Sequence, residues 1–148
     1  MADISENYTN NFESLTDEQK IIFLRTLIFL ANADDRFDNE ELSFIETIAD
    51  EYGLDKKIIQ KYIKNDSEES LLADLKKISP RRVALELIKE MCFLAHSDDV
   101  LSDRETLFIG NAGQAMGIEL DKIEQISNWV IDRIIWLEQA RLIFEDVK

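Results

Sequence analysis

Apolar residues recur along most of this 148-residue chain at the three- and four-residue spacing of amphipathic helices. No segment alternates between apolar and polar residues with the period of two that marks a strand. Two segments, residues 17–33 and 80–96, are apolar around nearly their whole circumference, which is typical of helices buried at the centre of a domain. The pattern predicts five further helices, at about 38–52, 55–64, 67–78, 102–116 and 121–144. We therefore expect an all-α fold of about seven helices.

The chain contains an internal repeat. Residues 28–45 align without gaps to residues 92–109, and eight of the eighteen positions are identical where chance would give roughly one. The identical pairs are Phe29/Phe93, Leu30/Leu94, Ala31/Ala95, Asp34/Asp98, Asp35/Asp99, Glu41/Glu105, Phe44/Phe108 and Ile45/Ile109. The repeat superimposes one all-round apolar helix on the other. We expect these two helices to pack on each other between two pseudo-symmetric halves, residues 15–65 and 80–145.

Signals at the predicted helix ends agree with this division. A serine or aspartate followed three residues later by glutamate predicts capping boxes at 38–41 and 102–105. A glycine stands where each of the two helices opened by these boxes should end, at 53 and 117. No proline- or glycine-rich linker separates the halves, so residues 15–146 are expected to form one domain preceded by a polar arm at 1–14.

The composition narrows the classes of partner. A net charge of −14 argues against binding a phosphate backbone or an anionic membrane surface, and favours cations, basic partners or simple solubility. Cys92 is the only cysteine, so no internal disulfide can form and a reducing compartment is indicated. No apolar run reaches the roughly 18 residues of a membrane span, and the amino terminus lacks a signal-peptide pattern. These features predict a cytoplasmic protein without membrane insertion.

The acidic turn that follows each central helix carries the clearest candidate chemistry. Asp34 and Asp98 lie in the last turn of a helix, where the macrodipole disfavours an anion by a few tenths to about 1 kcal/mol. Free backbone carbonyls cluster at the same end. Carboxylates and carbonyls together suit Ca²⁺ or Mg²⁺, although the spacing is not that of an EF-hand. The alternative is a solvated turn whose aspartates accept hydrogen bonds from local backbone N–H groups.

The other repeated acids complete the candidate ligand set but also have simpler explanations. Glu41 and Glu105 stand at the third helical position, where they complete capping boxes. Asp35 and Asp99 follow a helix end, where aspartate tolerates the left-handed conformation better than most residues. The predicted metal ligands are Asp34, Asp98, Glu41 and Glu105, with accessory acids Asp35 and Asp99.

The repeated pattern Ala-x-Ala-Asp-Gly-x-(apolar)-x-x-x-Glu after an apolar helix resembles that of the TerB-like superfamily, which includes tellurite-resistance TerB proteins and the amino-terminal domain of DjlA-type DnaJ co-chaperones. The matching residues are Ala31, Ala33, Asp34, Phe37 and Glu41 in the first copy and Ala95, Asp98, Leu101 and Glu105 in the second. The resemblance implies an all-helical domain with two similar halves, acids that bind divalent cations, and an adaptor role in bacterial stress response or membrane-associated complexes.

The chain departs from that family pattern at one position of each turn. The family usually has glycine after the first aspartate, whereas this chain has Asp35 and Asp99. The additional carboxylate either adds a metal ligand or distorts the turn and abolishes the site.

Cys92 and His96 are four residues apart on one helix face and could act as nucleophile and base. The repeat argues against this role, because their counterparts are Ile28 and Asn32, which gives Cys92 a core position. No phosphate-binding glycine loop, zinc motif or hydrolase motif is present. We therefore expect a non-enzymatic protein with a packed cysteine and a half-exposed histidine.

The last predicted helix has two apolar stripes. The first is expected to be its core stripe and comprises Ile123, Ile126, Val130, Ile134 and Leu137. The second lies beside it and comprises Trp129, Trp136, Ala140 and Ile143. We favour burial of this second stripe in the domain core. The alternative is a surface for a protein partner, with Trp129, Trp136 and Ile143 as contact residues.

Overall fold

Two helices, α2 (Asp17–Asn32) and α6 (Arg81–His96), form the centre of the fold. The structure is a computed structural model that describes residues 15–33, 39–64, 66–96 and 102–145. The polar arm predicted at 1–14 lies outside these residues. Within them the secondary structure is entirely helical, which confirms the predicted all-α class. The other helices are α3 (Asn39–Tyr52), α4 (Lys57–Lys64), α5 (Glu68–Leu75), α7 (Asp103–Ala115) and α8 (Leu120–Phe144).

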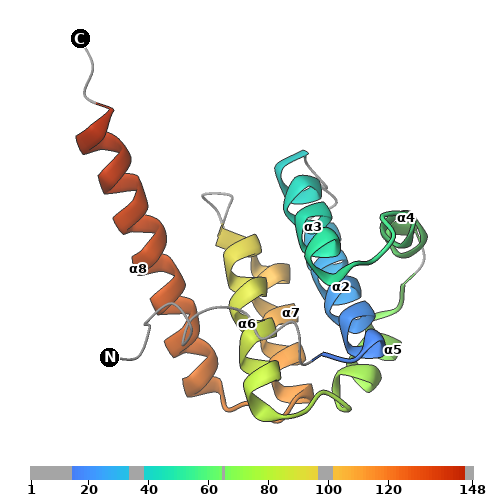
Figure 1. The fold of residues 1–148 in the computed structure, drawn as a ribbon. Helices are drawn as coiled ribbons and strands as arrows, with labels where there is room; N and C mark the ends of the chain where they lie inside the picture. The colour runs from blue at the N-terminus through green and yellow to red at the C-terminus, as the bar shows by residue number, and fades with distance from the viewer. Residues whose placement is uncertain (1–14, 34–38, 65, 97–101, 146–148) are drawn as a thin grey trace, which may run out of the picture.

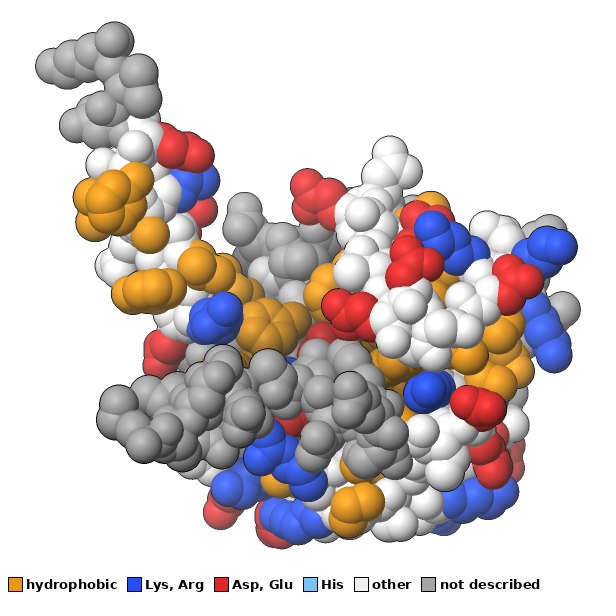
Figure 2. All heavy atoms as spheres, viewed as in Figure 1, with side chains coloured by type: hydrophobic (Ala, Val, Ile, Leu, Met, Phe, Trp, Pro, Cys, Tyr) orange, Lys and Arg blue, Asp and Glu red, His pale blue; other side chains and the backbone are white. Residues whose placement is uncertain are grey.

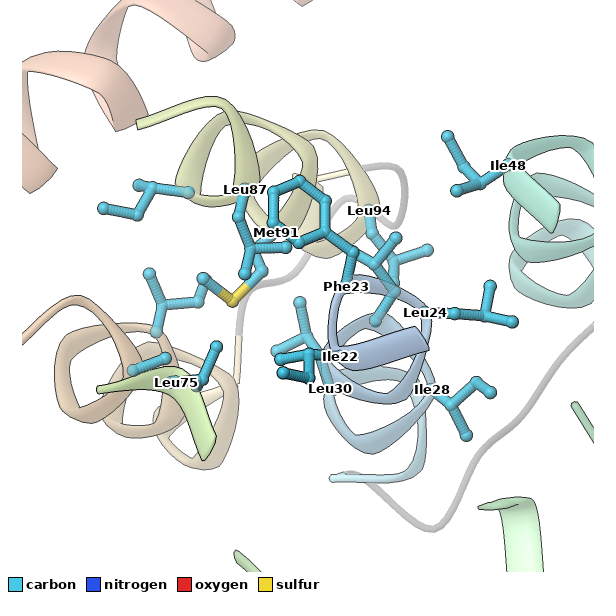
Figure 3. Close-up of a cluster of buried hydrophobic side chains, with 14 of the residues drawn as sticks. Ile22, Phe23, Leu24, Ile28, Leu30, Ile48, Leu75, Leu87, Met91 and Leu94 are labelled. Carbon is cyan, nitrogen blue, oxygen red and sulfur yellow. The ribbon is translucent and has the colours of Figure 1, made fainter. Parts of the chain in front are cut away.

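The central pair organises the other helices as the repeat predicted. Helix α2 packs on α6 and also contacts α3, α4, α5 and α7, while α6 contacts α7 and α8 (Figure 1). Phe23 of α2 lies close to Leu87 and Met91 of α6, and all three are fully buried (Figure 3). The two halves also meet through Phe29 and Phe108, whose ring centroids are 4.8 Å apart. Burial of these apolar side chains is the main stabilising contribution to the fold.

Helix ends follow the local sequence signals. The Ser102 hydroxyl accepts a hydrogen bond from the Glu105 backbone N–H at 3.1 Å, and the Glu105 carboxylate accepts one from the Ser102 N–H at 3.2 Å. This confirms the second capping box, whereas the first depends on Asp38, outside the described residues. Gly53 and Gly117 have φ of 72° and 78°, the left-handed conformation that glycine adopts without steric cost.

A buried ion pair connects several elements in the first half of the chain. The Arg25 guanidinium, on α2, donates two hydrogen bonds to Asp66, at 3.1 and 2.9 Å, and one to Asp74 at 2.7 Å. The Arg25 and Asp66 side chains are only 10% and 7% exposed. The guanidinium also lies over the Tyr62 ring of α4, 5.2 Å from its centroid. One cation therefore connects α2 to α4, to α5 and to the segment between them.

The structure corrects the expectation that α8 is buried along its length. Ile123 and Val130 are buried, and Ile126 and Ile134 pack partly against the core, but Leu137 of the same stripe is 47% exposed. Three members of the second stripe are exposed as well, namely Trp129, Trp136 and Ile143, so the favoured core position was wrong for them. The physical reason is that α8 packs mainly on α6 and α7 among the described helices, and its carboxyl-terminal half extends beyond them (Figure 1).

The described helices include none whose length and apolarity would suit a membrane span.

Candidate functional site

The repeat has two corners, the end of α2 with the start of α3 and the end of α6 with the start of α7, and both lie at the same end of the molecule (Figure 1). Helices α2 and α6 both end there, and α3 and α7 both begin there (Figure 1). A contact joins the corners: Arg104, in the first turn of α7, donates from Nη1 to the Ala33 carbonyl after α2 at 3.5 Å. The four aspartates predicted as ligands, Asp34, Asp35, Asp98 and Asp99, lie outside the described residues.

The two repeated glutamates are both buried. Glu41 is 4% exposed and Glu105 is 5% exposed. The capping hydrogen bond from Ser102 already engages one carboxylate oxygen of Glu105, so its helix-capping explanation holds. Among the described residues, no group of three or more His, Cys, Asp or Glu side chains is placed to hold a metal ion. A metal site at the corners stays a prediction that depends on the aspartates.

Arg104 changes the electrostatics expected at the first corner. The sequence suggested that free carbonyls at the end of α2 would attract a metal cation, but one of them accepts a hydrogen bond from a guanidinium of the protein. The repeat contains the signal for this difference, because the first copy has Glu40 where the second has Arg104. The two copies of the repeat therefore differ in charge at this position.

Cys92 occupies the core position that the repeat assigned to it. Its side chain is 1% exposed, and burial raises the pKa of the thiol to about 12, although a hydrogen bond with Ser127 acts in the opposite direction. His96 is half-buried and its Nε2 lies 3.2 Å from the Ser127 hydroxyl, and burial lowers the pKa of the imidazole. At neutral pH the thiol is therefore protonated, whereas a nucleophilic cysteine needs its thiolate form.

We predict that a maleimide will not label Cys92 in the folded protein and will label it fully in denaturant. Burial prevents the reagent from reaching the sulfur, and it also keeps the thiol protonated, so that little of the reactive thiolate is present. Mass spectrometry after timed exposure measures the reaction. An Ile143→Cys variant is the control, because position 143 is 66% exposed and should react at once. Rapid labelling of Cys92 at neutral pH would instead reopen the catalytic hypothesis.

Six of the nine exposed large apolar side chains among the described residues lie on the carboxyl-terminal half of α8. Trp136 is 63% exposed and Ile143 is 66% exposed, and hydrophobic side chains line the part of α8 that extends from the body (Figure 2). Leu142 and Phe144 add to this surface at 62% and 83% exposure. Neither residue was among those expected to contact a partner. The sequence signal for them is that the last two turns have more apolar residues than one helix face can hold.

The charged residues of the same turns are grouped away from this surface. Arg141 Nε donates to the Glu138 carboxylate at 3.1 Å, and Arg141 Nη1 lies 3.3 Å from the Glu145 carboxylate. Spaced by three and four residues, these side chains share one side of the helix. The opposite side comprises Trp129, Trp136, Ala140 and Ile143, which we call the α8 stripe.

The α8 stripe leads at its base into a groove between α6 and α8. The groove has a volume of about 280 Å³ and an apolar floor of Leu85, Ile126 and Trp129. Three cations surround the floor: Arg82, Lys89 and Lys122. Sequence reasoning missed these residues, because helical periodicity does not reveal which cations of two different helices will converge.

Glu86 lies between two of the groove cations. Its carboxylate is 2.9 Å from an Arg82 nitrogen and 2.7 Å from the Lys89 ammonium. Lys122, on the opposite wall, donates to the Gln125 side chain at 2.9 Å. The Lys89 ammonium also lies 3.6 Å from the Glu90 carboxylate, so two glutamates accompany Arg82 and Lys89 on this wall of the groove.

Comparisons with protein-family models, with curated proteins and with solved structures found no match.

Proposed function

We propose that this chain is a non-enzymatic protein-interaction module whose contact surface is the carboxyl-terminal half of α8. The observation that carries the proposal is the exposure of Trp136, at 63%, together with exposed apolar neighbours on the same two turns. Contiguous apolar surfaces of more than a few hundred Å² are rare on monomeric proteins and mark interaction sites. Tryptophan is also enriched among the residues that dominate binding energy at protein interfaces.

The charge of the chain favours a protein over the other classes of partner. A nucleic-acid phosphate backbone and an anionic membrane would both be repelled by a net charge of −14. The exposed turns of α8 carry only a small net charge, because Arg141 pairs with both Glu138 and Glu145. An apolar surface with few uncompensated charges suits a protein partner.

Replacing Trp136 by alanine should abolish partner capture without changing the fold. The side chain is 63% exposed, so its removal leaves no cavity and the helical signal in circular dichroism should persist. Loss of an interface tryptophan typically weakens binding by about 2 kcal/mol or more. The measurement is capture of binding proteins from an extract of the source cells by immobilised wild-type and Trp136→Ala chains.

The matched control is Leu107→Ala, which truncates a residue of α7 that is 65% exposed. This variant should capture the same proteins as the wild type. If Trp136→Ala unfolds the chain, Trp136 is a structural residue. If capture survives in a folded Trp136→Ala variant, the contact surface lies elsewhere.

A second proposed function is divalent-cation binding at the paired corners. The observation that favours it is that α2 and α6 end on the same side of the molecule (Figure 1). Asp34, Asp98, Glu41 and Glu105 are the proposed ligands, with Asp35 and Asp99 as accessory acids. Together with the TerB-like resemblance of the repeated turn, this supports a cytoplasmic adaptor role in stress response, with Ca²⁺ or Mg²⁺ as the ligand.

If the cation site exists, Ca²⁺ or Mg²⁺ should raise the melting temperature, because a ligand that binds only the folded state stabilises it by about 2.7 kcal/mol at a hundred times its dissociation constant. The measurement is thermal unfolding with and without millimolar cation. The double variant Asp34→Asn with Asp98→Asn should lose the shift. A wild-type chain that gives neither a calorimetric heat nor a stability shift would refute the site.

A further inference from the structure

We propose that the amino-terminal arm, residues 1–14, docks into the groove between α6 and α8 and holds these two helices together. The arm precedes the described residues, whereas the groove and the start of α2 lie within them. Three observations support the docking: the point where the described chain begins, the length of the groove, and the sequence of the arm. The inference goes beyond the proposed function, because the groove lies at the base of α8 and the proposed contact surface lies at its other end.

The described chain begins beside the start of α6. Leu15 is buried in the core at 7% exposure, which fixes the point where the arm leaves the body. The Gln19 side chain accepts a hydrogen bond from the Thr16 N–H at 3.0 Å and donates one to the Ser79 carbonyl at 2.8 Å. A single side-chain amide therefore links residue 16 to the turn before α6. Ser79 stands only three positions before Arg82, which lines the groove, so the arm emerges close to one end of the groove.

The groove follows both helices away from that end. Its lining residues have the same spacing on each helix, at positions 82, 85, 86 and 89 of α6 and 122, 125, 126 and 129 of α8. Helices α6 and α8 pack side by side and begin at the same end of the molecule (Figure 1). Arg82 and Lys122 therefore lie at the near end of the groove, and Lys89 and Trp129 lie at the far end. From position 82 to position 89 a helix rises about 10 Å, which is the length that an occupant must cover.

The arm is long enough for the groove and has apolar residues at a matching separation. Its 14 residues span up to about 46 Å when extended. Tyr8 and Phe12 are four positions apart, which is about 13 Å of extended chain. Their side chains share one side of that chain, because successive side chains alternate. In the docked arm Phe12 covers Leu85 and Ile126, and Tyr8 reaches Trp129.

The floor of the groove offers apolar surface to both rings. Leu85 and Ile126 are only partly buried, and Trp129 is 42% exposed. The Trp129 indole packs edge-on against Phe93, with the ring centroids 6.3 Å apart, so it is held in one orientation. A ring placed on an ordered indole gains from the aromatic contact as well as from burial.

The charges around the groove permit an acidic occupant. The arm has three acidic residues and no lysine or arginine. Three cations line the groove, so the arm meets less repulsion there than on a purely acidic surface of this chain. The pairs that Arg82 and Lys89 make with Glu86 and Glu90 stay in place, because burial of the two rings drives the docking.

Tethering favours the arm over a separate molecule as the occupant. A segment joined to the body by a short linker has an effective concentration on the order of 1 mM at its site. A separate protein at micromolar concentration would need a contact about a thousandfold tighter to compete. The docked arm covers Trp129 at the base of the α8 stripe and leaves Trp136 and Ile143 accessible to a partner.

Disulfide crosslinking within the full chain tests the docking. Asn10 stands between the two rings, on their side of an extended chain, and Gln125 is an exposed residue of the groove wall. The double variant Asn10→Cys with Gln125→Cys should form an intramolecular disulfide on mild oxidation. Asn10→Cys with Gln114→Cys is the matched control, since Gln114 is exposed but lines a different cavity, between α5 and α7. The control should crosslink about tenfold more slowly or less. The native Cys92 is buried and does not interfere.

Fluorescence quenching tests which residue the arm covers. The chain has two tryptophans, so Trp136→Phe leaves Trp129 as the single reporter. In that background, Tyr8→Ser with Phe12→Ser should raise the acrylamide quenching constant about twofold or more, because the indole loses its covering rings. In the Trp129→Phe background, the same arm change should leave the quenching of Trp136 unaltered, since that residue is already 63% exposed.

Each outcome either supports or overturns the docking. A disulfide to position 125 that forms no faster than the control, or Trp129 quenching that the arm change leaves unaltered, overturns it. Disulfide-linked dimers in place of the intramolecular product would assign the groove to the arm of a second copy and would also overturn it. If the two serine substitutions unfold the chain, the crosslink decides alone, because its variants replace polar residues and keep both rings.

Discussion

Replacing Arg25 by methionine should destabilise the folded chain by about 3–5 kcal/mol, the usual cost of removing one member of a buried ion pair. The Asp66 side chain, only 7% exposed, would lose both of its hydrogen bonds from the guanidinium and remain as a buried carboxylate without its cation. Chemical denaturation followed by circular dichroism gives the change in unfolding free energy.

Arg81→Met is the matched control for this prediction. The Arg81 guanidinium contacts Glu119 at 2.7 Å, as closely as Arg25 contacts Asp74, but the two side chains are 48% and 58% exposed. Solvent screens such a pair, so its loss should cost only a small fraction of the Arg25 effect. Equal losses of unfolding free energy in the two variants would show that the buried Arg25 ion pair stabilises the fold no more than the exposed Arg81 pair does.

The Arg25 effect should also depend on pH. Hydrogen bonding to Arg25 holds the pKa of Asp74 below its ordinary value. A carboxyl group whose pKa is lowered by folding stabilises the protein above its unfolded pKa, about 3.9, and loses that contribution as the pH falls through the folded pKa. The difference in stability between wild type and Arg25→Met should therefore be full at neutral pH and shrink below about pH 4.

The central architecture could be predicted from the sequence because its signals are local or repeated. Apolar residues around both central helices required burial on all sides, and the alignment of Phe29 with Phe93 assigned the two helices equivalent positions. The structure confirms that α2 and α6 pack together. Ser102 caps the start of α7 and Gly117 follows its end, and both signals involve only residues close by in the sequence. For this reason the predicted ends of α7 were accurate to about two residues.

The surroundings of α8 could not be predicted in the same way. Periodicity shows which side of a helix is apolar, but not whether another element runs beside it. Helix α8 has 25 residues and α6 has 16, and the far turns of α8 extend past the end of α6 (Figure 1). For this reason Leu137 belonged to a core-like stripe in the sequence and is nevertheless 47% exposed.

The ion pair and the corners also depend on contacts between residues far apart in the sequence, which local patterns do not predict. Arg25 and its partners Asp66 and Asp74 are 41 and 49 residues apart in the chain, so no local pattern joins them. The sequence contained one indication of this ion pair, namely that the positively charged Arg25 lies within an otherwise apolar helix. At the corners, the repeat predicted which acids recur, but the hydrogen bond from Arg104 to Ala33 depends on a contact between the halves.

Truncating Leu27 to alanine should cost about 2–5 kcal/mol of unfolding free energy, the range observed for large-to-small changes in well-packed cores. Leu27 is fully buried on α2, where five other helices converge. The loss includes the transfer free energy of the removed methyl groups and the cavity they leave. Denaturant unfolding measures the change, and an unchanged slope with denaturant would show that the variant still unfolds as one unit.

Leu107→Ala is the matched control, because it makes the same leucine-to-alanine change at an exposed position. Leu107 is 65% exposed on α7, so the same truncation opens no cavity, and stability should change by no more than about 0.5 kcal/mol. Met91 gives a second comparison, since it occupies the position in the repeat that Leu27 occupies in the first copy and is also fully buried. Met91→Ala should destabilise the fold comparably, because both side chains are fully buried in the same core. A loss at Leu27 no larger than that at Leu107 would mean that α2 is not the centre of the core.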